Sequence, residues 1–95
     1  MSITLDNVYL NTARQICTER HVRAWLVGGA VRDLLLGVPV GDWDIAIERD
    51  AIGAARATAN RLQADVYVLD AEHDTARVIA ADGTRATLET WLSRV

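Results

Sequence analysis

Residues 27–47 read VGGAVRDLLLGVPVGDWDIAI. In this stretch the diglycine Gly28-Gly29 separates a short apolar segment at 24–27 from a segment of helical character at 29–36. Gly37 follows the second segment, as glycine commonly does where a helix ends. Diglycines often serve tight turns and bind nothing. A turn from strand to helix, however, exposes unpaired amides at the positive helix end, and two residues without side chains would let a phosphate approach them.

Residues 42–48 alternate between polar and apolar side chains. Trp43, Ile45 and Ile47 are predicted to face the core of a strand, so that Asp42 and Asp44 emerge side by side on the other face. An isolated pair of this kind is most often a solvated strand surface. Carboxylates on one strand face can also share a hard cation, because Mg²⁺ takes one or two carboxylates plus phosphate oxygens. The upstream diglycine favours the metal interpretation here.

The other elements predict an α+β fold with a mixed sheet of about five strands backed by helices. Helices are expected at 5–20, with Thr4 as a cap, and at 51–62, with Asp50 as a cap. Strands are expected at 66–69, 75–80 and 85–90, the last two joined by the hairpin signal Asp82-Gly83. Trp25 and Trp43 are both expected in the core.

The composition is that of one folded domain outside the membrane. The chain has 95 residues, of which 51% are hydrophobic and 24% charged, and no apolar run approaches the roughly 20 residues that span a bilayer. Its single cysteine, Cys17, cannot form an internal disulfide and is expected to be buried, while His21 and His73 are expected on the surface. The expected location is the cytoplasm. The net charge of −3 is unfavourable for gripping a nucleic acid.

The chain resembles the opening of the class II tRNA nucleotidyltransferase (CCA-adding enzyme) and bacterial poly(A) polymerase family. The residues that carry the resemblance are Gly28, Gly29, Arg32, Asp33, Gly37, Asp42 and Asp44. It implies the nucleotidyltransferase (polymerase-β-like) fold and the transfer of AMP or CMP from ATP or CTP to the 3′ end of an RNA such as tRNA. It further implies two Mg²⁺ ions on the catalytic Asp42 and Asp44, with the nucleotide held by Gly28, Gly29, Arg32 and Asp33.

The family carries a third catalytic acid on the strand after the hairpin. A comparison without gaps places Thr87 at this position, and threonine cannot ligate a cation as a carboxylate does. Glu89 lies two residues further on and shares a strand face with Thr87. We therefore expect Glu89, and not Thr87, to face the aspartate pair and to act as the third catalytic residue.

Residues 1–95 are expected to form a single head domain, excised or truncated from a longer enzyme, with the RNA gripped mainly by segments outside this chain. Two alternatives remain at this stage. One is a minimal nucleotidyltransferase acting on a protein or a small molecule, although such families usually carry Gly-Ser instead of Gly28-Gly29. The other is a degenerate nucleotide-binding module without catalysis, which the doubtful third acid favours.

Overall fold

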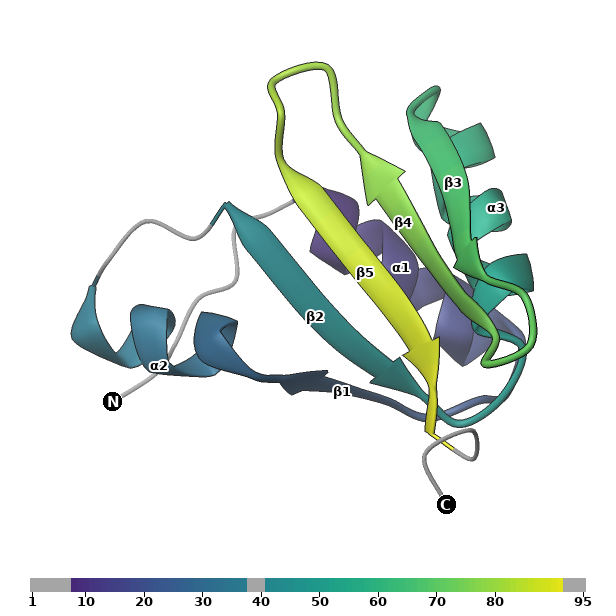
Figure 1. Cartoon of the computed structure of the whole chain (residues 1–95), viewed down its shortest axis with the longest axis horizontal. Helices are drawn as coiled ribbons and strands as arrows, with labels where there is room; N and C mark the ends of the chain where they lie inside the picture. Colours follow the sequence, from purple (N-terminus) through teal and green to yellow (C-terminus); the bar gives the residue numbers. More distant parts are fainter. Residues whose placement is uncertain (1–7, 38–40, 92–95) are drawn as a thin grey trace.

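The computed structural model describes residues 8–37 and 41–91 (Figure 1). The elements in chain order are α1 (Val8–Glu19), β1 (Ala24–Val27), α2 (Gly29–Leu36), β2 (Asp42–Ile47), α3 (Ala51–Leu62), β3 (Asp65–Asp70), β4 (Thr75–Ile79) and β5 (Arg85–Thr90). Each predicted helix and strand is present. The predicted start of the first helix at residue 5, with its cap at Thr4, falls outside the described residues.

The strands form one mixed sheet in the order β1-β2-β5-β4-β3. β2 and β5 are parallel, and the other neighbouring pairs are antiparallel. α3 packs against β3, β4 and β5, and α1 packs against α3. Both helices lie behind the sheet in Figure 1, so the opposite face is turned toward the viewer. We call it the open face, because no described helix covers it. The predicted α+β fold with a five-stranded mixed sheet is confirmed.

The core fixes which side of β2 faces outward. Trp43, Ile45 and Ile47 are at most 5% exposed, whereas Asp42 and Asp44 are exposed on the open face. Burying an apolar side chain of this size contributes about 1.5–3 kcal/mol. Turning β2 over would expose three such side chains and bury two carboxylates. The predicted orientation of the aspartate pair is therefore confirmed and strongly determined.

The expectation that both tryptophans belong to the core is wrong for one of them. Trp43 is 5% exposed, but Trp25 is 39% exposed. Trp25 is the register partner of Ala46 and so lies on the open face, where its ring centroid is 5.7 Å from that of Trp91. β1 consists of four apolar residues without alternation, and such a segment carries no signal for which residues face inward.

Three other residues lie as expected. Cys17 is buried in α1, and this burial raises the pKa of its thiol. His21 and His73 are exposed. Within residues 8–37 and 41–91, every helix is too short or too polar to cross a membrane.

Two aspartates hold the start of α3. Asp50 is the predicted cap, and its carboxylate accepts a hydrogen bond from the Gly53 amide at 3.2 Å. Asp74, from the turn between β3 and β4, accepts from the amides of Ala51 and Ile52, both at 3.0 Å, and from the hydroxyl of Thr90. Burial would raise the pKa of Asp74, but these hydrogen bonds outweigh it, so the pKa lies below its ordinary value. Asp74 thus ties α3 to the β3–β4 turn and to the end of β5.

We predict that Asp74→Asn lowers the free energy of unfolding by about 1–3 kcal/mol at neutral pH, because an amide nitrogen would replace one acceptor among buried donors. Asparagine also tolerates the positive φ of 51° at this position. The pKa of Asp74 is lower in the folded than in the unfolded chain, where it is about 3.9. The stabilisation by the Asp74 carboxylate is therefore fully present above the unfolded pKa and is lost as the pH falls through the folded pKa.

Urea unfolding of the wild type and of Asp74→Asn, at neutral pH and near the unfolded pKa, measures this difference. The matched control is Asp65→Asn, at an exposed aspartate that begins β3. Equal unfolding midpoints for the two variants at neutral pH would contradict the role of Asp74.

Candidate metal and phosphate site

The turn at Gly28 lies directly against Asp44. β1 pairs with β2 so that Val27 is opposite Asp44, and the chain turns into α2 immediately afterwards. A β-carbon on Gly28 would lie 3.1 Å from Asp44 Oδ2, and Gly28 has a φ of +76°. The backbone conformation therefore favours glycine here, and a β-carbon would also crowd the Asp44 carboxylate. The consequence is that the start of a helix and a carboxylate are held side by side.

The start of α2 offers positive charge. Gly28 has no side chain that could cap the helix, and the Val31 amide donates to the Gly28 carbonyl at 3.3 Å. The amides that precede Val31 lie at the positive end of the helix dipole. A β-carbon on Gly29 would lie 3.4 Å from a terminal nitrogen of Arg32, so the Arg32 guanidinium lies beside the diglycine. Arg32 Nε is 3.5 Å from Asp33 Oδ1, which restrains the arginine loosely. The structure thus brings Gly28, Gly29, Arg32 and Asp44 together.

Asp42 forms an ion pair with Arg85, which no local sequence pattern indicated. Arg85 Nε lies 2.7 Å from Asp42 Oδ1, and a terminal nitrogen of Arg85 donates to Oδ2 at 3.3 Å. The two side chains are 48% and 63% exposed, and such a surface pair contributes at most about 1 kcal/mol. A cation arriving at Asp42 would therefore displace Arg85 at small cost.

The position beside Asp44 belongs to Thr87, and the expectation that Glu89 would take it is wrong. β2 and β5 are parallel with Asp44 opposite Thr87 and Ala46 opposite Glu89. Glu89 is on the open face, as predicted, but it lies two residues beyond Thr87 on β5. This spacing is about 7 Å along the strand. The charge of Glu89 acts on His73, whose pKa is raised mainly by the hydrogen bond to Asp70. Among the described residues no three His, Cys, Asp or Glu side chains are grouped to hold a metal ion.

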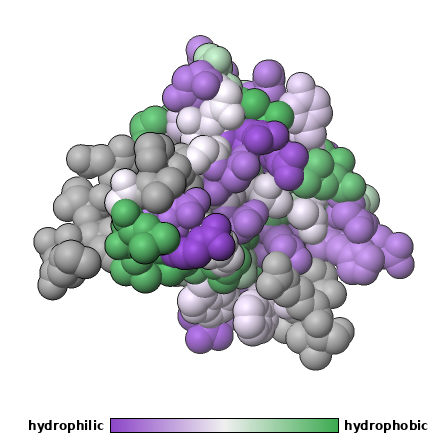
Figure 2. Space-filling model, turned by 60° about the vertical axis from the view of Figure 1, so that its left-hand side comes forward, coloured by the Kyte–Doolittle hydropathy of each residue, from purple (hydrophilic) through white to green (hydrophobic). Residues whose placement is uncertain are grey.

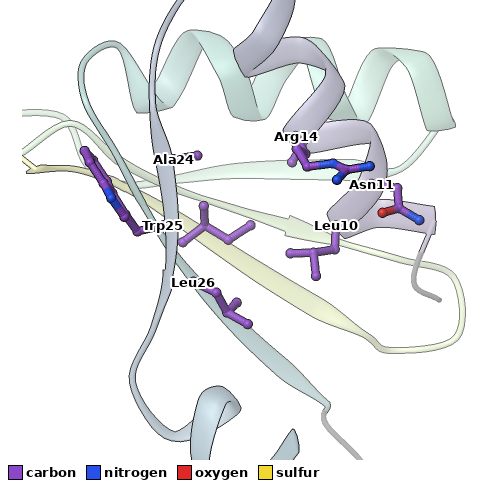
Figure 3. Close-up of a pocket in the computed structure, with 8 residues that line it drawn as sticks. Leu10, Asn11, Arg14, Ala24, Trp25 and Leu26 are labelled. Atoms are coloured by element: carbon purple, nitrogen blue, oxygen red, sulfur yellow. The ribbon is translucent and has the colours of Figure 1, made fainter. Parts of the chain in front are cut away.

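Two cavities flank the edge strand β1, and neither contains the aspartates. One, of about 480 Å³, lies between α1 and β1 (Figure 3), and the other, of about 660 Å³, lies beside Trp25 and Trp91. The acid pair is itself exposed to solvent. Figure 2, turned so that the α2 side comes forward, shows apolar surface next to hydrophilic surface on this side of the molecule, and α2 exposes Leu35 and Leu36. A substrate of the acid pair would therefore be bound on a surface that is accessible to a large molecule.

Comparison with known proteins decides the family. Residues 24–95 match the poly(A) polymerase head domain family. The chain belongs to this family. Its members are metal-dependent nucleotidyltransferases, and the predicted family is thereby confirmed.

Individual relatives agree with this assignment. The head domain is 48% identical over 64 residues to the CC-adding tRNA nucleotidyltransferase of Synechocystis sp. and 40% identical over 65 residues to the A-adding enzyme of Halalkalibacterium halodurans. Each match covers 65% of this chain and 15% of the relative. A solved tRNA nucleotidyltransferase, complexed with a primer tRNA and an incoming ATP analog, matches with a TM-score of 0.74 and 36% identity, over 82% of this chain and 22% of that one. The chain therefore spans less than a quarter of the length of these relatives.

We predict that Arg85→Gln strengthens the binding of Mn²⁺ to the nucleotide-free head domain by up to about fivefold, because the cation no longer displaces a guanidinium worth about 1 kcal/mol. Calorimetric titration with Mn²⁺ measures the affinity, and Arg85→Lys serves as the control that keeps the positive charge. An affinity that falls in Arg85→Gln would show that Arg85 does not compete for Asp42.

Proposed function

We propose that this head domain is the catalytic part of an enzyme that transfers AMP or CMP from ATP or CTP to the 3′ end of tRNA, in the cytoplasm. The observation that carries the proposal is the contact between Gly28 and Asp44, which joins a phosphate-binding helix start to a metal-binding carboxylate. Support comes from the names of the relatives, which add CC or A to tRNA, and from the solved relative with primer tRNA and an ATP analog.

The chemistry of the donors fits Mg²⁺. Asp42 and Asp44 present exposed carboxylate oxygens on one strand face, and oxygen ligands that leave room for water and phosphate are what this ion prefers. In the proposal these two residues hold two Mg²⁺ ions. When bound, the ions would polarise the phosphate and offset the charge of the leaving pyrophosphate.

The other residues bind and orient the nucleotide. The amides of Gly28 and Gly29 would donate hydrogen bonds to the triphosphate at the positive end of α2, and the adjacent Arg32 would add a full positive charge. Asp33 would limit the positions of the Arg32 guanidinium. A catalytic role of Glu89 stays a prediction, and it rests on the open face that Glu89 shares with Asp44.

A nucleotide-binding module without transfer is the second candidate. It is favoured by the hydroxyl of Thr87 beside Asp44, where a third carboxylate would help to activate the attacking oxygen. Both candidates predict nucleotide binding, and only the first predicts transfer that depends on Asp44.

We predict that the 95-residue chain binds ATP, CTP, GTP and UTP with affinities within about threefold of one another, because phosphate and metal contacts dominate at the diglycine turn. Competition against a fluorescent ATP analogue in the presence of Mg²⁺ measures these affinities, and Asp44→Asn should weaken all four. A strong preference for one base would contradict the proposed mode of binding.

Transfer of radiolabelled AMP to a tRNA that lacks its 3′ terminus separates the two candidates. The chain alone should transfer slowly and lose this activity in Asp44→Asn. Nucleotide binding without any transfer that depends on Asp44 would support the module instead.

A further inference from the structure

One row of side chains crosses the open face through all five strands. The strand register aligns Val27, Asp44, Thr87, Arg77 and Tyr67, each opposite the next. Because register partners point to the same side of a sheet, a carboxylate, a hydroxyl, a guanidinium and a phenol follow one another at about 4.8 Å per strand. The neighbours of Arg77 in sequence, Ala76 and Val78, are buried in the core, which confirms that Arg77 points to the open face.

Arg77 is positioned but has no anionic partner among the described residues. It is half-buried, and its Nε donates a hydrogen bond to Thr87 Oγ1 at 3.1 Å. Most other arginines of the described chain are in ion pairs, including Arg85 with Asp42. A guanidinium that is fixed at Nε and leaves its terminal amino groups to external acceptors is well suited to bind a phosphate.

The position of Arg77 relative to the diglycine indicates which phosphate it would bind. Gly28 lies on the β1 side of Asp44, whereas Arg77 lies two strands away on the other side, at about 10 Å. In phosphoryl transfer the attacking and leaving oxygens are roughly in line on opposite sides of the phosphorus. If the triphosphate occupies the diglycine turn, pyrophosphate leaves toward β1. The attacking RNA hydroxyl must then approach over β5 and β4, where Arg77 lies.

Tyr67 extends this row at the edge of the sheet. It lies on β3 opposite Arg77 and is 53% exposed. Aromatic side chains beside basic ones are typical of surfaces that bind single-stranded nucleic acid, because each base has a face that can stack.

We propose that Arg77 binds a backbone phosphate of the acceptor RNA near its 3′ end and that Tyr67 stacks on a base of the same strand. The proposal rests on the proposed function, since it takes the position of the triphosphate from it. It assigns the open face between β5 and β3 to the acceptor and the β1 side of Asp44 to the nucleotide.

NMR titration of the ¹⁵N-labelled 95-residue chain tests this division, with two separate probes. The first is a tetracytidylate RNA with a free 3′ hydroxyl, and the second is ATP with Mg²⁺. We expect the RNA to shift the Arg77 side-chain Nε–H signal and the amides of Tyr67 and Thr87, and ATP to shift Gly28 and Gly29.

The variant Arg77→Gln should weaken RNA binding several-fold, while ATP binding is unchanged. The salt dependence of the RNA affinity should fall by about the contribution of one phosphate contact. Arg77→Lys should restore most of the salt dependence. Arg56→Ala is the matched control, because it removes one exposed positive charge from α3, which covers the other face of the sheet. The amide signals of core residues such as Leu88 report whether each variant is folded.

Equal RNA binding by Arg77→Gln and the wild type would overturn the proposal, and so would a loss of ATP binding together with RNA binding. RNA shifts that depend on Arg77, without any ATP response at Gly28 and Gly29, would support the RNA site and contradict the proposed nucleotide site.

Discussion

At its first three residues β2 is buried on one face only, and the positions of the charged groups follow from this asymmetry. The helical side of the sheet covers Trp43, Ile45 and Ile47, so Asp42 and Asp44, which alternate with them, must emerge on the open face. The parallel neighbour β5 then places Arg85 and Thr87 at the same level as the aspartates. A local apolar pattern thereby determines a site to which three strands contribute.

The second constraint is the close approach of Gly28 to Asp44. A β-carbon at Gly28 would lie 3.1 Å from the carboxylate, so the turn into α2 and the acid lie directly against each other. The positive end of α2 and the Arg32 guanidinium then lie on one side of Asp44, and the paired Arg85 lies near Asp42 on the other. The two carboxylates thus have positive charge on both sides even without a metal, which suits the proposed binding of a triphosphate.

Local signals predicted most of the fold, and long-range register accounts for what they missed. The αL glycine at Gly37, the Asp50 cap and the Asp82-Gly83 hairpin all concern residues a few positions apart, and each lies where it was predicted. Arg85 pairs with Asp42 across 43 residues, and Asp74 caps α3 across 23. The alternation of side chains along a strand predicted the correct face for Glu89. It could not predict which β2 residue lies opposite Glu89, because parallel register depends on packing between distant segments. For the same reason no local pattern indicated the row that contains Arg77.

We propose that a divalent cation and a triphosphate meet at the Asp42–Asp44 pair beside the diglycine turn. Paramagnetic broadening of the ¹⁵N-labelled chain by Mn²⁺, with and without a non-hydrolysable ATP analogue, tests it most directly. We expect broadening centred on residues 42–44 and on Gly28 and Gly29, stronger with the nucleotide and absent when both aspartates are changed to asparagine. Broadening centred on another acidic site, such as Asp70 and His73, or unchanged in the double variant, would contradict it.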